Sequence, residues 1–292
     1  MKETTKFDLS HKAARVYLTF RKWNPEARDD AAAGEVLSSK QATRGSGKFT
    51  KKLIGDDLRK AITKAETFVR TAHYDMTLPW SDDGWRLITT AAFADYVKMI
   101  DEGRRMLNDA IAPLLNSWPS IVEQQKTRLG KLFSEDDYPP VNVLRSKYAI
   151  DYRIEPIVTA GDFRCNLAQA DVDAIKQSME ERMKENMREA QMAVWSQLND
   201  SLSRFLERMD SGGAFRDSLV GNLRDLCTMI PKLNVFGDKE LDAVADAVMT
   251  NIASLEPDML RPAKTEGAEV FMQMAGAEAR RLLEIINNRT RR

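Results

Sequence analysis

The 292-residue sequence contains few of the side chains that build metal or nucleophilic sites. It has two histidines, His11 and His73, and two cysteines, Cys165 and Cys227. CxxC and HExxH patterns are missing, so a transition-metal site of the usual kind has few ligands to use. Two cysteines exclude a disulfide framework and indicate a reducing compartment; we expect both to be small buried hydrophobes. The sequence therefore predicts neither a metal nor another cofactor.

The chain also lacks long apolar runs and an excess of either charge. No stretch reaches the roughly 18 apolar residues of a membrane span, and the first residues lack the apolar core of a signal peptide. Lys plus Arg and Asp plus Glu both number 44, so whole-chain charge predicts neither a nucleic-acid nor a membrane partner. We expect a soluble cytoplasmic protein without a membrane partner, and any nucleic-acid site must come from local asymmetry.

Alternating side chains predict a small antiparallel sheet in the N-terminal part. Residues 15–23 and 148–158 alternate apolar or aromatic with polar side chains, and 162–167 follows after a Thr-Ala-Gly turn. Period two with β-branched and aromatic residues is typical of half-buried strands. We expect the last two stretches to form a hairpin or a loose pair. The first stretch is their expected partner, because an isolated hairpin is marginal in water.

Apolar residues in steps of three or four predict helices near 56–73 and 90–133. Asp56 gives a start signal for the first helix, and Thr90 is a good N-cap for the second. Pro113 should kink the second helix, because proline removes a backbone donor and clashes with the preceding turn.

The clearest pattern is an apolar stripe from Asp171 to Met209 that no proline or glycine interrupts. Its spacing predicts one face of a helix roughly 60 Å long at about 1.5 Å per residue. Such a helix needs other helices or a second copy to cover it, so a coiled-coil homo-oligomer and an ordinary core both stay open. The candidate oligomer-interface residues are Met179, Met183, Met187, Val194, Leu198, Leu202 and Phe205.

Three shorter helices are expected after this long one, the second of them capped by Asp238. The predicted fold class is therefore α+β, predominantly α-helical, with long amphipathic helices and a small antiparallel β-sheet. We predict two regions. Residues 1–168 form an N-terminal α+β region, and residues 169–292 contain the long spine helix and the C-terminal helices.

Two kinds of motif resemble catalytic or ligand-binding sites, but neither has the features that such a site needs. Gly45-Ser46-Gly47-Lys48 resembles a phosphate-binding loop, but Ala42 replaces the first glycine and Phe49 replaces the magnesium-binding Ser or Thr. Asp82-Asp83 and Asp136-Asp137 could act as paired acids or divalent-cation ligands. Adjacent aspartates in turns are more often solvated turn formers. The sequence therefore predicts a protein that is not an enzyme.

One local charge excess lies between Lys40 and Arg70, where nine basic residues face three acidic ones. Such a segment can follow a phosphate backbone, and a nearby aromatic ring can stack on bases. It can equally be a solvated face that pairs with the acidic surface of a neighbouring subunit. The candidate nucleic-acid-binding residues are Lys40, Arg44, Lys48, Phe49, Lys51, Lys52, Arg59, Lys60 and Lys64.

Several short blocks resemble a family of proteins encoded by bacteriophages, prophages, plasmids and integrative elements and catalogued as a domain of unknown function. The blocks are Lys51-Lys-Leu53, Leu78-Pro-Trp80 to Arg86, Leu129-Gly130 to Phe133, Tyr138-Pro139, Gly161-Asp-Phe163 and Phe215-Arg-Asp-Ser218. The resemblance implies an origin in a mobile element and work in the cytoplasm of a bacterial host. It also implies possible AAA+ ATPase partners of the MoxR or cobaltochelatase type and von Willebrand A-domain partners. It carries over no catalytic residue.

These features lead to two hypotheses. The first is a non-enzymatic, self-assembling, phage-type protein that binds nucleic acid, such as single-stranded DNA in replication or recombination. The alternative is an assembly or adaptor protein that works with an AAA+ ATPase and a von Willebrand A-domain partner, or a structural phage component.

Overall fold

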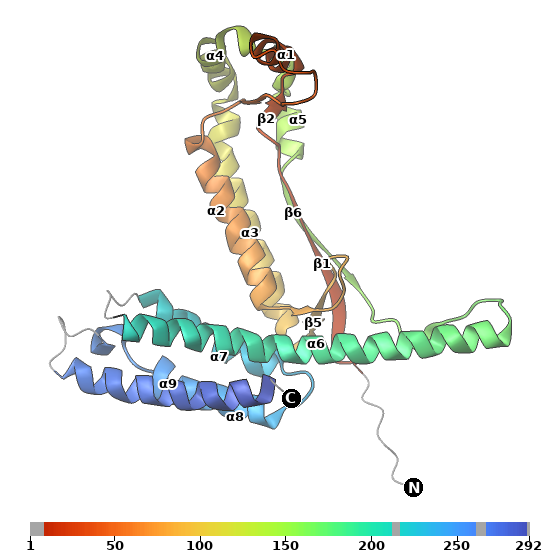
Figure 1. Ribbon diagram of the computed structural model, residues 1–292, viewed down its shortest axis with the longest axis vertical. Helices are drawn as coiled ribbons and strands as arrows, with labels where there is room; N and C mark the ends of the chain where they lie inside the picture. Colours follow the sequence, from red (N-terminus) through yellow and green to blue (C-terminus); the bar gives the residue numbers. More distant parts are fainter. Residues whose placement is uncertain (1–8, 212–216, 261–266, 291–292) are drawn as a thin grey trace. The chain divides into compact units, whose positions relative to one another are not determined.

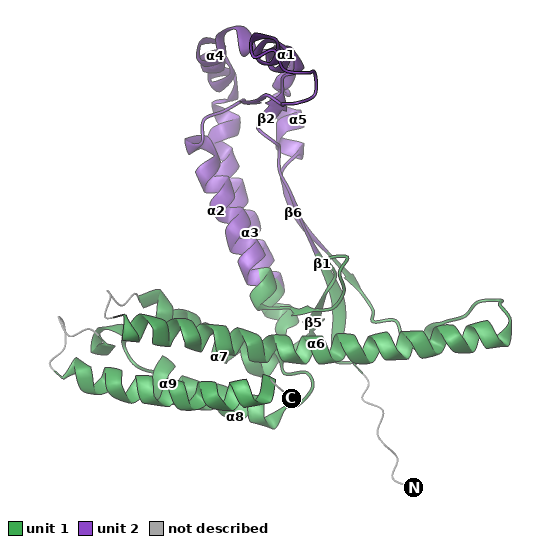
Figure 2. Ribbon diagram, viewed as in Figure 1, with its two compact units in different colours: residues 1–17, 73–96, 153–292 green, residues 18–72, 97–152 purple. Residues whose placement is uncertain are grey.

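The computed structural model describes residues 9–211, 217–260 and 267–290. The chain is 68% helical, with a small antiparallel sheet of four strands and a two-stranded sheet, which confirms the predicted helical α+β class (Figure 1). It forms two compact units, coloured separately in Figure 2. Unit 1 comprises residues 1–17, 73–96 and 153–292, and unit 2 comprises residues 18–72 and 97–152.

The predicted boundary between residues 168 and 169 does not separate these units. The reason is the core of unit 1, where Ala13, Leu78 and Leu87 from N-terminal strands are buried in the same cluster as the long helix α6 (Gln169–Asp210). Burying these side chains removes apolar surface from water on both elements at once. The early strands therefore belong with the late helices.

The four-stranded sheet has the order β4-β5-β1-β6. Its strands are β1 (Ala13–Arg21), β4 (Leu78–Pro79), β5 (Arg86–Thr89) and β6 (Ala149–Glu155). β5 pairs antiparallel with β1, Ala13 lying opposite Thr89, and with β4, Leu78 lying opposite Leu87. The predicted pairing of the first strand with residues 148–158 is confirmed, whereas no strand was predicted at β4 or β5.

The predicted strand at 162–167 is wrong. Residues Ala160–Asp162 form a 3-10 turn, and the stretch after it has no strand. The cause is local, because the Thr159 backbone N–H and hydroxyl both donate to the Asp162 carboxylate, at 2.9 and 2.7 Å. Side chains that bond nearby backbone in this way compete with strand pairing.

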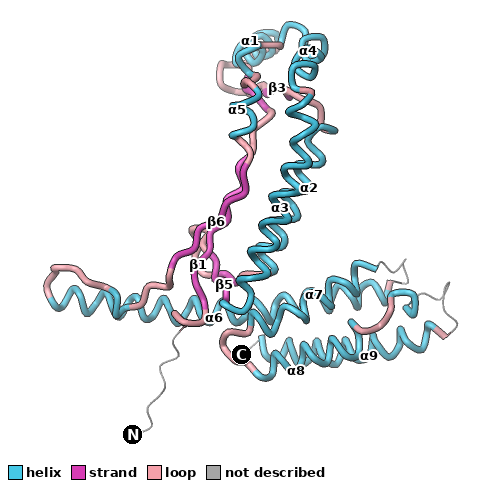
Figure 3. The backbone as a smooth tube through the Cα atoms, turned by 180° about the vertical axis from the view of Figure 1, so that it is seen from behind, coloured by secondary structure: helices cyan, strands magenta, loops and turns pink. Residues whose placement is uncertain are grey.

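The C-terminal half of α6 is the centre of unit 1. Its buried face packs against three helices (Figure 3). They are α7 (Asp217–Leu233), α8 (Lys239–Val248, continued by a π-helical turn at Met249–Ala253) and α9 (Ala268–Thr290). Asp238 caps α8 as predicted, since its carboxylate accepts from the backbone N–H groups of Glu240 and Leu241.

Unit 2 is built on two long helices that lie side by side, α2 (Asp57–Asp75) and α3 (Thr90–Asn116). A Cβ at Gly103 would lie 2.2 Å from the Val69 side chain, so glycine is what permits this close approach. The predicted helix 90–133 is broken at Ser117, four residues after Pro113. The remaining elements are β2 (Glu26–Arg28), α1 (Asp30–Ser39), β3 (Thr50–Lys52), α4 (Trp118–Leu129) and α5 (Val141–Ser146), with 3-10 turns at Gly130–Leu132 and Glu135–Asp137.

Candidate nucleic-acid interface

Residues 40–48, which we call the basic loop, connect α1 to β3 in a shape fixed by two turns. α1 ends with Gln41 in the left-handed region, at φ 51°. The Gln41 and Ala42 N–H groups donate to the carbonyls of Ser38 and Leu37, at 3.0 and 2.9 Å, the pattern of a Schellman motif. A second turn follows, in which Gly45 has φ 93° and the Ser46 N–H lies 3.1 Å from the Thr43 carbonyl oxygen.

Three cations project from this loop. Lys40, Arg44 and Lys48 are all exposed, and among the described residues none has a carboxylate partner. Phe49 follows directly and is half-buried, and its carbonyl accepts from the Asp29 N–H at 3.0 Å. The loop therefore places three unneutralised charges beside an aromatic residue on a backbone that is already ordered.

Four other predicted residues lie on β3 and the first turns of α2. Lys52 bonds Asp56 at 3.0 Å and Lys60 bonds Asp57 at 2.8 Å. The hydrogen bond from Lys52 lowers the pKa of Asp56, and the hydrogen bond to Asp57 raises the pKa of Lys60. Arg59 contacts Glu26 at 3.3 Å, and Lys64 is exposed with no ion pair in the described part of the chain. These exposed pairs are weak, so phosphate can compete for the cations.

Lys51 does not belong to this surface. Its side chain lies inside unit 2, and the residue is 7% exposed. The ammonium lies 2.8 Å from Asp137 and 3.4 Å from Asp29, and it donates to the Leu132 carbonyl at 2.7 Å. Although burial lowers the pKa of Lys51, its bonds to the two aspartates more than offset this and leave the pKa raised. Lys51 joins β3 to α1 and to the turn that contains Asp137, so we remove it from the candidate set.

Tertiary structure adds two cations that the sequence analysis missed. The Arg128 guanidinium, at the end of α4, donates to the Lys52 carbonyl, although 76 residues separate the two in sequence. Lys131 lies in the following turn and is exposed. Neither has a carboxylate partner within the described ranges. At the end of a helix such residues are expected simply to complement its dipole, so no sequence signal marked them.

The predicted oligomer interface on α6 divides into two parts. Val194, Leu198, Leu202 and Phe205 are almost fully buried against the chain's own helices, so the expectation that they contact a second copy is wrong. The three methionines, in contrast, are half-buried and line a pocket of about 970 Å³ in unit 1.

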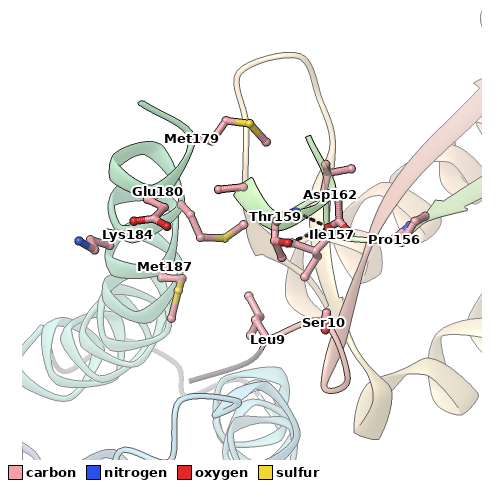
Figure 4. A pocket seen from close by; sticks show the side chains of 14 residues that line it. Leu9, Ser10, Pro156, Ile157, Thr159, Asp162, Met179, Glu180, Lys184 and Met187 are labelled. Atoms are coloured by element: carbon pink, nitrogen blue, oxygen red, sulfur yellow. Dashed lines mark hydrogen bonds between the residues drawn. The ribbon is translucent and has the colours of Figure 1, made fainter. Parts of the chain in front are cut away.

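The pocket lies between the N-terminal half of α6 and the segment that leads into it (Figure 4). One wall carries the methionines together with Glu180 and Lys184. The opposite wall is the chain from Pro156 to Asp162, and Leu9 and Ser10 complete the lining. Most of these side chains are apolar, and the polar ones give the pocket two carboxylates and one ammonium group.

The residues considered for chemistry are dispersed. Among the described residues, no group of three or more His, Cys, Asp or Glu side chains is placed to hold a metal ion. His73 is buried, with Nδ1 2.9 Å from the Tyr96 hydroxyl. Cys227 is buried as expected, and burial raises the pKa of its thiol to about 12. Cys165 is exposed, which corrects the expectation of burial, because the strand predicted to bury it does not form.

The paired aspartates also separate in role. Asp83 accepts from the Ser81 hydroxyl and the Trp85 N–H, as a turn former does, whereas Asp137 is the ion-pair partner of Lys51. In the part of the chain that the structure describes, no helix is long and apolar enough to cross a membrane.

Comparisons with protein families, curated proteins and solved structures find no match to this chain.

Proposed function

We propose that this protein is a non-enzymatic nucleic-acid-binding protein that contacts the phosphate backbone through its basic loop. The observation that supports this best is the exposure of Lys40, Arg44 and Lys48 on one short loop, without carboxylate partners in the described ranges. A cation that has no internal partner gives up no ion pair when it binds phosphate. The binding free energy that this cation gains by releasing counterions is therefore not reduced by the cost of breaking an ion pair.

The shape of the loop favours the same function. Because the two turns already fix its backbone, binding orders fewer residues and loses less conformational entropy. Lys52 and Arg128, joined through the Lys52 carbonyl, extend the positive charge beyond the loop. Phe49 offers an aromatic ring on which an unpaired base can stack, so we propose single-stranded DNA as the preferred ligand.

The resemblance to mobile-element proteins agrees with such a ligand, since replication and recombination expose single strands. We propose on that basis that the protein works in the cytoplasm of a bacterial host. Salt-dependent binding with little sequence preference is expected, because contacts to phosphate carry no direct sequence information.

The test is a triple substitution, Lys40→Ala with Arg44→Ala and Lys48→Ala, measured by fluorescence anisotropy with a labelled oligothymidine at several salt concentrations. Each lost phosphate contact should reduce the slope of log K against log salt by about 0.7, so the triple variant should lose about 2.

The matched control removes three cations that lie outside the basic loop and the first turns of α2, in Arg105→Ala with Lys126→Ala and Arg281→Ala. Glu102, Glu123 and Glu278 hold these residues in helix-surface pairs. The net charge changes equally, yet the salt slope should stay close to that of the parent protein. Absence of binding at low salt, or an equal loss in the control, would contradict the proposal and favour the assembly or adaptor alternative.

A further inference from the structure

β3 begins just after the basic loop and has too little strand pairing to hold its position alone. It has three residues, and its one partner strand in the described ranges is the three-residue β2, with Ala27 opposite Lys51. A sheet of two strands is marginally stable in water. The position of β3 must therefore depend on contacts with other parts of unit 2.

The end of α4 and the turns after it supply these contacts. Each of the three residues 51, 52 and 53 makes one hydrogen bond to this part of the chain, and we call the three bonds the β3 clamp. They run from the Lys51 ammonium to the Leu132 carbonyl at 2.7 Å, from the Arg128 guanidinium to the Lys52 carbonyl, and from the Tyr138 hydroxyl to the Leu53 carbonyl at 2.8 Å. Lys51 and Tyr138 are buried, so losing either bond leaves a buried polar group without its partner.

Lys51 also holds α1, the element at the other end of the basic loop. Asp29 is the N-cap of α1, and its carboxylate lies 3.4 Å from the Lys51 ammonium. The Asp29 backbone N–H donates to the Phe49 carbonyl at 3.0 Å, which joins the start of α1 to the residue before β3. Because α1 is a single helix of ten residues, fixing its first turn also fixes where it ends. Both ends of the basic loop therefore depend on the contacts of Lys51.

We propose that the β3 clamp holds the basic loop in the shape that binds phosphate, so that Lys51 and Tyr138 are positioning residues for the nucleic-acid contact. This inference rests on the proposed function and adds to it the buried residues that set the affinity. Both side chains lie inside unit 2, so they act through the loop and not by touching the nucleic acid. A loop that must first be ordered loses more conformational entropy on binding, and affinity falls although every phosphate contact is still made.

The experiment compares two clamp variants of the full chain with the parent protein. Tyr138→Phe removes one hydroxyl and keeps the packed ring, whereas Lys51→Met removes the ammonium and keeps an unbranched side chain. The matched control is Tyr96→Phe, because Tyr96 is a buried tyrosine of unit 1 whose hydroxyl lies 2.9 Å from His73 Nδ1. Circular dichroism checks that each variant is folded. If Lys51→Met does not fold, Tyr138→Phe alone carries the test.

The first measurement is the binding of labelled oligothymidine by fluorescence anisotropy at several salt concentrations. Each clamp variant should bind about 2- to 10-fold more weakly than the parent, because binding must then order loop side chains that the parent already holds. The slope of log K against log salt should stay that of the parent, because Lys40, Arg44 and Lys48 are all still present. The Tyr96→Phe control should match the parent in both affinity and slope.

The second measurement is limited trypsin digestion without nucleic acid, which reports the order of the loop directly. Trypsin cleaves after lysine and arginine, so the basic loop offers sites after Lys40, Arg44 and Lys48. Cleavage after Arg164, which is exposed in unit 1, is the internal reference. The ratio of loop cleavage to reference cleavage should rise severalfold in the clamp variants and stay unchanged in Tyr96→Phe, because local opening exposes only the segment that opens.

The inference is overturned if the folded clamp variants keep either the affinity or the cleavage ratio of the parent, if their salt slope falls, or if Tyr96→Phe weakens binding equally. A parent protein that does not bind oligothymidine would remove the proposed function. In that case the cleavage ratio alone decides whether the clamp orders the loop.

Discussion

The two halves of α6 have the same apolar spacing and very different surroundings. From Ala190 to Met209 the apolar face is buried by α7, α8 and α9, and Leu198, Leu202 and Phe205 are completely buried. From Val172 to Met187 the same stripe is only half-buried and borders the pocket. Spacing therefore shows that a helix has a face to cover, but it does not show what covers it.

The largest expected difference between the two halves is in stability. Leu202→Ala should reduce the free energy of unfolding by about 2–5 kcal/mol, because it removes buried methyl groups and leaves a cavity. Met183→Ala should cost less than about 1.5 kcal/mol, because its side chain is partly solvated in the folded protein. Urea denaturation followed by circular dichroism measures both. Equal losses would mean that the N-terminal half is covered as fully as the C-terminal half.

An intermediate effect concerns Asp238, which anchors the buried half of α6. Its carboxylate accepts from Trp195 Nε1 at 3.1 Å and from the Gln191 amide at 3.0 Å. Burial alone raises its pKa, but the bonds from Trp195, the Leu241 N–H and Gln191 lower the pKa below its usual value. A carboxyl with a lowered folded pKa adds stability above its unfolded pKa, near 4, and that stability is lost as pH falls through the folded value.

Asp238→Asn should therefore be less stable than the parent by about 1–2 kcal/mol at neutral pH, the difference expected for losing hydrogen bonds to a charged acceptor. The difference should begin to narrow below about pH 4, where the carboxyl of the unfolded chain becomes protonated, and should narrow further as pH falls through the lower pKa of the folded protein. Denaturation series at several pH values test this. A difference that stays constant into acid would show that the charge of Asp238 contributes nothing.

The smallest expected difference between the two halves of α6 is in the oxidation rates of their methionine side chains, and it does not involve stability. Met179, Met183 and Met187 should be oxidised by dilute hydrogen peroxide severalfold faster than Met209, because oxidation follows exposure and Met209 is buried. Peptide mass spectrometry over time measures the four rates. Similar rates for all four would remove the distinction between the halves.

Much of the fold followed from local patterns. The helices at 56–73 and 171–209 and the Asp238 cap depend on periodicity or capping that a short window contains. The pairing of the first strand with residues 148–158 followed from two local strand patterns and from the low stability of an isolated hairpin. What could not be predicted depends on distant residues. The cover of α6 comes from strands and helices on both sides of it in sequence, and no spacing within the helix specifies them.

The candidate site shows the same limit at the level of single side chains. Lys51 and Lys52 are adjacent and chemically equal, yet β3 points the first inward to Asp137 and the second outward. Only the alternation of side chains along a strand could have shown which lysine points inward. β3 has three residues, which is too short a strand to recognise from the sequence. Arg128 joins the patch through a carbonyl 76 residues away, which charge counting along the sequence cannot detect.

Gly103 offers a means of recognising true relatives of this chain when overall similarity is low. Any side chain at position 103 would collide with Val69 and force α3 away from α2. The close packing of these two helices in unit 2 therefore requires glycine at this position. A distant sequence that shares the two helices should keep glycine opposite a β-branched residue at this separation of 34 positions, counted from Val69 to Gly103. One position can thus separate homologues from helical proteins that only share the composition.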